Sequence, residues 1–215
     1  MRVTLAAVRH GLMLERAFGK AGPRIEDAHH YRHHLVDQRC GWAHWRSGEL
    51  LGTVRLHGSA DLFASPKAGR WWLAARRGQV IMHRRAATVP DLFGLKVVVT
   101  PPEGWRGSLA GILKTLVDGL TAALHAHDPV VDPRIPDRAA KIDPALTPDD
   151  LRALLAEPVL APLGRVRFIT PWRDSVQLSP ADDRMVAFDI RLSRDRPPGT
   201  VIAEAVDVGP IHRTS

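Results

Sequence analysis

The stretch from Trp105 to Asp128 constrains the fold most, because it carries the longest uninterrupted helical pattern in the sequence. Ser108 can cap this helix, since its hydroxyl can accept a hydrogen bond from a free amide of the first turn. Lys114 and Asp118 are four residues apart and are predicted to pair. Apolar residues at three- and four-residue steps form one face, namely Leu109, Ile112, Leu113, Leu116, Val117, Leu120, Ala123 and Leu124. The pattern predicts a core helix whose opposite, solvated face carries Lys114, Asp118, Thr121 and His125.

The segments around this helix predict an α+β fold. Thr147 and Pro148 can open a short helix that ends near residue 157. Two hairpins are predicted, over residues 42–58 with a turn at Ser47-Gly48 and over residues 70–83 with a turn at residues 76–78. Further strands are predicted at Leu95–Thr100, Val166–Thr170, Met185–Leu192 and Thr200–Val208. We expect a mixed β-sheet with one long amphipathic helix and a few shorter helices packed on it.

Length and composition favour one domain over residues 1–215, with residues 1–65 as a candidate N-terminal extension and residues 129–165 as a Pro-rich insertion holding the short helix. A hydrophobic fraction of 45% is enough for a core. The lone Cys40 cannot form an internal disulfide or a cysteine zinc site, so we expect a cytosolic protein in which this thiol is a small buried hydrophobe. The sequence contains no long apolar run, so no signal peptide or membrane span is predicted.

Charge is unevenly distributed along the chain. Residues 1–107 hold 17 Lys and Arg against 8 Asp and Glu, whereas residues 108–215 hold 13 against 15. A basic half beside a slightly acidic half suits a polyanion-binding surface next to a carboxylate site. Codon bias is an alternative explanation for the preference for Arg over Lys, but it does not explain the asymmetry. The candidate phosphate contacts are Arg70, Arg76, Arg77, Arg84, Arg85, Arg106 and Lys114. Equally, Trp71 or Trp72 in the second hairpin can be core residues beside exposed arginines.

A histidine cluster lies in a predicted helix over Ile25–Gln38. On a helix, His29 with His33 and His30 with His34 would share a face and give two geometrically possible metal pairs, the second extended by Asp37. A solvated or phosphate-facing helix is the competing interpretation.

Asp182 and Asp183 form an acidic pair just before the predicted strand at Met185. Adjacent carboxylates are costly unless they are solvated, paired or holding a cation, and oxygen-rich sites of this kind hold Mg²⁺. Such a Mg²⁺ can organise a phosphodiester for attack by water. A turn or helix cap is the simpler interpretation of the pair.

The order of these features resembles the RusA-type Holliday-junction resolvases. Lys114 matches the family's lysine, and Val117-Asp118-Gly119-Leu120 resembles its Leu-Asp-Ala-Leu segment. Asp182-Asp183-Arg184-Met185-Val186 resembles its Asp-Asp-x-x-Val segment. The resemblance covers about residues 95–128 and 179–192. It departs at the helix start, where Ser108, Ala110 and Gly111 stand in place of the family's Asp-x-Asp-Asn motif.

The resemblance implies a degenerate nuclease core that binds nucleic acid, DNA rather than RNA, without cutting it, because loss of two carboxylates weakens Mg²⁺ binding. One alternative is an active Mg²⁺-dependent endonuclease that uses Asp118, Asp182, Asp183 and Lys114, helped by His127 or Asp128. Another is an assembly subunit without nucleic acid, a homodimer or larger, whose interfaces use the six Trp residues and the Pro-rich segment.

Overall fold

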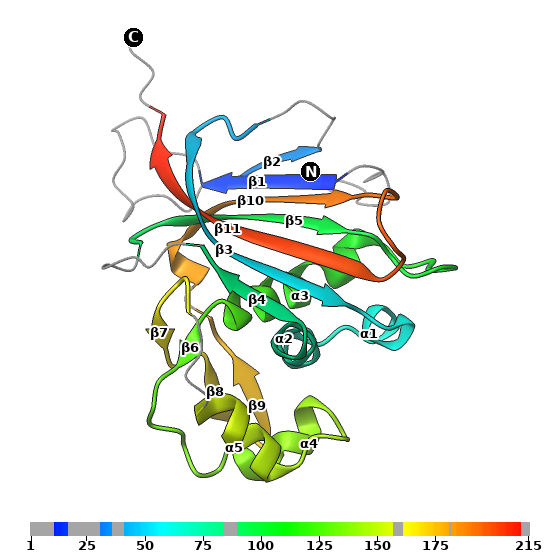
Figure 1. Cartoon of the computed structure of the whole chain (residues 1–215), viewed down its shortest axis with the longest axis vertical. Coiled ribbons are helices and arrows are strands. Elements are labelled where there is room, and N and C mark those ends of the chain that lie inside the picture. Colours follow the sequence, from blue (N-terminus) through cyan, green and yellow to red (C-terminus); the bar gives the residue numbers. More distant parts are fainter. Residues whose placement is uncertain are drawn as a thin grey trace.

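A seven-stranded mixed sheet forms the upper part of the molecule in the computed structural model (Figure 1). The structure describes residues 11–16, 31–35, 41–83, 90–156, 161–180 and 182–211, with the backbone alone for residues 31–35 and 182. The strand order is β2-β1-β10-β5-β11-β3-β4. β10 and β5 run parallel, and the other neighbouring pairs are antiparallel. The strands are β1 (Gly11–Arg16), β2 (Tyr31–Leu35), β3 (Trp45–His57), β4 (Gln79–Met82), β5 (Phe93–Val99), β10 (Met185–Leu192) and β11 (Thr200–Pro210).

Three helices lie on one side of this sheet: α1 (Ala60–Ala64), α2 (Ala68–Arg77) and α3 (Leu109–Ala123) (Figure 1). Alternate residues of β5, such as Leu95 and Val97, pack with the apolar faces of these helices in the main core. The predicted long helix, its cap and its surface pair are confirmed. The amide of Gly111 donates to Ser108 Oγ over 3.2 Å, and Lys114 Nζ lies 3.0 Å from Asp118 Oδ2. The α+β prediction is likewise confirmed.

The expected solvated face of α3 is only partly correct, because Thr121 and His125 are buried. α2 packs on α3 at Gly119, where an added Cβ would lie 2.4 Å from Trp71 Cβ. The end of α3 is covered in turn by a loop whose Gly164 carbonyl lies 3.2 Å from His125 Nδ1.

Neither predicted hairpin forms. Residues 68–77 are the helix α2, in which Trp71, Trp72 and Ala75 are buried. This burial at helical spacing outweighs the strand preference of Trp. Residues 45–57 are one continuous strand, since β11 pairs along its length as far as Trp45. Ser47 of the expected turn pairs with Val208, and register shifts absorb residues between Ser47 and Gly52.

The helix expected over residues 25–38 is wrong for Tyr31–Leu35, which form β2 and pair with β1. His33 lies opposite Leu14 in this ladder, and His34 lies opposite Met13. The helical spacing that suggested metal pairs therefore does not apply to these two residues. His29, His30, Asp37 and Cys40 lie outside the described residues.

A smaller lobe lies below the sheet and its helices (Figure 1). The Thr147 cap is confirmed, because Thr147 Oγ1 accepts from the Asp150 amide over 3.1 Å and donates to Asp150 Oδ2 over 2.6 Å. The strand expected over residues 166–170 is divided between β7, which pairs with β6, and β8, which pairs with β9. The lobe contains β6 (Ala126–His127), the 3₁₀ helix η3 (Pro136–Arg138), α4 (Ala139–Ile142), α5 (Pro148–Ala156), β7 (Arg165–Val166), β8 (Ile169–Trp172) and β9 (Ser175–Leu178).

The lobe and the sheet share one hydrophobic core. Phe168 from the lobe packs on Trp72 of α2 with 5.8 Å between the ring centroids, and Ile142 and Leu151 join the same buried cluster. The lobe is therefore packed directly on α2 through this shared core. Among the described residues, the helices lack the length and apolar character needed to cross a bilayer.

Candidate nucleic-acid interface

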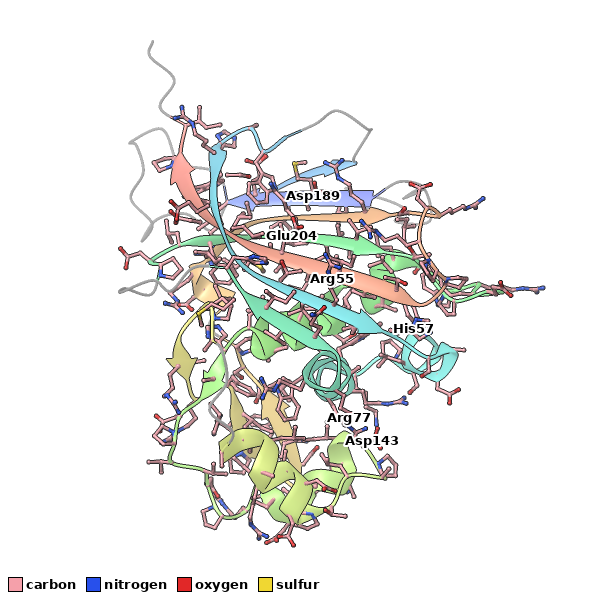
Figure 2. The ribbon with its side chains drawn as sticks, in the orientation of Figure 1. Arg55, His57, Arg77, Asp143, Asp189 and Glu204 are labelled. Carbon is pink, nitrogen blue, oxygen red and sulfur yellow. The ribbon has the colours of Figure 1, made fainter. Side chains whose placement is uncertain are left out.

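A groove of about 390 Å³ opens where the end of β3, α1, α2 and the end of α4 meet. We name it the α1/α2 groove. Figure 2 places His57, Arg77 and Asp143 at this junction between the sheet and the lobe. Its cationic or protonatable side chains are His57, Arg70 and Arg77, opposed by the carboxylate of Asp143. The lining is His57, Ser59, Leu62, Arg70, Leu73, Ala74, Arg77, Gly78 and Asp143.

The two arginines of the groove reach it from one face of α2, because they are seven residues, or about two helical turns, apart. Arg70 Nη1 donates to the carbonyls of Asp61 and Ser65 over 3.4 and 3.3 Å and so ties α1 to α2. Arg77 is exposed in the last turn, where a cation is favoured by the helix dipole. Arg77 is therefore the freer of the two to meet a ligand.

His57 is fixed at the end of β3 by the loop that precedes β11. Gly58 donates its amide to the Gly199 carbonyl over 2.7 Å. Gly199 has a φ of +81°, and a Cβ there would lie only 3.0 Å from His57 Cε1. The imidazole thus packs against the Gly199 backbone, and the ring remains exposed at the edge of the groove.

The structure brings only some of the predicted phosphate contacts together. Arg70 and Arg77 share the groove, whereas Arg76 is half-buried and is not part of its lining. Arg106 lies in a separate hollow on the other side of α1, beside Phe63 and Trp105. Lys114 lies on the exposed edge of α3 with its nitrogen paired to Asp118. Arg84 and Arg85 lie outside the described residues.

The predicted metal carboxylates do not form a cluster in the part of the chain that the structure describes, where no three His, Cys, Asp or Glu side chains gather to hold an ion. Asp118 pairs with Lys114 midway along α3. Asp183 is exposed in the 3₁₀ helix η4 (Asp182–Arg184), and its charge acts on the pKa of His125 at the end of α3. The side chain of Asp182 is not described.

The two histidines after α3 are buried. Burial lowers the pKa of His125 to about 4. It also lowers the pKa of His127, whose ring meets Phe168 edge-on at 5.0 Å. Asp128 accepts the Val130 amide over 2.9 Å and closes a local turn. His127, expected to help bind a metal ion, is thus packed against an aromatic ring, and Asp128, expected in the same role, closes a turn.

Another hollow, of about 320 Å³, lies on the sheet face opposite the helices. Asp189 is buried there and accepts from Arg191 Nη2 over 2.7 Å. Lys96 lies over the Trp42 ring, 5.3 Å from its centroid. Asp189 and Glu204, both labelled in Figure 2, line this hollow from the two strands that flank β5. Its charges are mixed, so it suits a polyanion less well than the α1/α2 groove.

Sequence reasoning missed His57, Ser59 and Asp143, because they come from the ends of three separate elements. It also missed Trp172, which is 56% exposed in the turn region of the β8–β9 hairpin. The adjacent Trp-Arg-Asp sequence was the only available signal for that residue.

Comparison with known proteins does not assign this chain to a family. The scan against family models and the searches of curated proteins and of solved structures each return no match.

Proposed function

We propose that this protein binds nucleic acid, DNA in preference to RNA, through the α1/α2 groove and does not cut it. The observation that carries the proposal is the placement of Arg70 and Arg77 on one face of α2, with His57 at the groove edge. Arginine is suited to phosphate because its planar guanidinium can donate two parallel hydrogen bonds. The basic first half of the chain supplies the wider attractive field.

The absence of cutting is proposed from the start of α3. In the RusA-like pattern this turn carries catalytic carboxylates, but here Ser108 caps the helix and Gly111 donates to it. Ala110 has no ligand atom in its side chain. A hard cation such as Mg²⁺ needs several oxygen ligands at short distance. Mg²⁺-dependent cleavage that stops on Asp183→Asn would replace this proposal with the nuclease alternative.

The proposal is tested by replacing Arg77 with Ala and measuring duplex DNA affinity by fluorescence anisotropy across a salt series. Loss of one phosphate contact weakens binding and reduces the slope of log affinity against log salt by about 1. Arg152→Ala is the matched control, since it removes one exposed arginine that pairs with Asp149 over 2.6 Å outside the groove. Equal effects of the two variants would point to net charge alone and count against the groove.

The assembly alternative predicts a different result. Light scattering that gives a large homo-oligomer, together with no shift of DNA at any salt concentration, would favour it. We expect the protein to act in the cytosol on the grounds of its single Cys40.

A further inference from the structure

The β8–β9 hairpin holds an aromatic side chain in solvent. Trp172 is 56% exposed, and it pairs with Ser175 across the hairpin, so Arg173 and Asp174 form the turn. Arg173 has a φ of 51°, in the left-handed region that residues other than glycine rarely adopt. The exposure of Trp172 contrasts with the burial of Trp42, Trp45, Trp71 and Trp72.

Two contacts from the neighbouring helices fix this turn. Arg138 Nη1 donates to the Ser175 carbonyl over 2.9 Å. Lys141 Nζ lies 3.3 Å from Asp174 Oδ2, and this hydrogen bond lowers the pKa of Asp174. The hairpin is thus tied to η3 and α4 on its second strand and its turn. Trp172 is presented by a supported structure, which reduces the entropy lost when a ligand stacks on it.

The charges beside the ring indicate what it can meet. The Arg173 guanidinium lies over Trp172, with its carbon 5.8 Å from the ring centroid, and the ring keeps its exposure despite this contact. Three cations, Arg138, Lys141 and Arg173, lie at the turn, and one of them, Lys141, pairs with the carboxylate of Asp174. An aromatic face next to an excess of cations suits an unpaired nucleobase with its phosphate. Bases inside a duplex are already stacked and cannot offer a face to it.

We propose that the turn of the β8–β9 hairpin binds single-stranded nucleic acid by stacking Trp172 on an unpaired base, with Arg173 contacting the adjacent phosphate. The inference rests on the proposed function in that the ligand is the same polymer. It adds a preference for unpaired segments and a second contact site, on the lobe.

The test compares three variants in binding to a labelled oligothymidylate and to a duplex of equal length. Trp172→Ala is expected to weaken oligothymidylate binding roughly 5- to 100-fold and to leave duplex binding unchanged. Trp172→Phe keeps an aromatic face and is expected to retain most of the affinity. Val130→Ala is the matched control, because Val130 is an apolar residue of the same lobe that is 65% exposed.

The outcomes separate this inference from the proposed function. Equal oligothymidylate affinity of the wild type and Trp172→Ala would overturn the inference, and a loss with Arg77→Ala in the same assay would leave the α1/α2 groove standing. Equal losses with Trp172→Ala and Val130→Ala would also overturn it. A wild-type protein that binds neither ligand would contradict the proposed function and this inference together.

Discussion

At the scale of single residues, His125 shows how burial sets the charge of a side chain. Its Nδ1 lies 3.2 Å from the Gly164 carbonyl, and desolvation lowers its pKa from 6.5 to about 4. Between these two pH values the unfolded chain binds the proton and the folded chain does not. The free energy of unfolding must therefore fall as the pH is lowered from about 6.5 to about 4, and His127 acts in the same direction.

This pH dependence can be measured by unfolding the protein at two pH values. Urea unfolding at pH 7 and near pH 4.5 is expected to show a loss of about 2–3 kcal/mol through His125. His125→Asn can still donate to Gly164 but does not titrate, so this variant should lose less stability over the same interval. If the wild-type protein and His125→Asn lose the same stability between these two pH values, His125 is not the group responsible. Asp174 does not interfere, because its lowered pKa affects stability only at more acidic pH.

At the scale of elements, α3 was predictable because its cap, its surface pair and its apolar stripe are all local signals. α2 was not, since two adjacent tryptophans favour a strand by propensity and become helical only when they pack on α3. β3 was misjudged for a similar reason, because its partner β11 lies more than a hundred residues away. The close packing of α2 on α3 depends on Gly119, because a Cβ added at this residue would lie only 2.6 Å from the Ala68 carbonyl oxygen.

Two glycines of α3 test the packing of α2 on α3. Gly119→Ala is expected to destabilise the protein by about 1–3 kcal/mol, because the methyl group forces α2 and α3 apart. Gly111→Ala is the control in the same helix, where the new Cβ would lie 3.4 Å from Ser108 Oγ. It should be neutral or stabilise by up to about 1 kcal/mol through helix propensity. Similar midpoints for the two variants in thermal unfolding would contradict the described crossing.

At the scale of the whole molecule, the α+β class and the order of β5, α3, β10 and β11 follow from the sequence. The site follows only in part. Local charge predicts Arg70 and Arg77 as phosphate contacts, although on a hairpin instead of the helix α2. His57 and Asp143 meet them only through tertiary contacts between distant segments. Such convergence has no local signature, so a single sequence cannot report it.

The measurement that bears most directly on the central claim is the salt dependence of duplex DNA binding by the wild-type protein. With Arg70 and Arg77 as phosphate contacts, log affinity should fall linearly with log salt, with a slope of about −2. An affinity that stays constant across the salt series, or no binding at the lowest salt, would contradict the account.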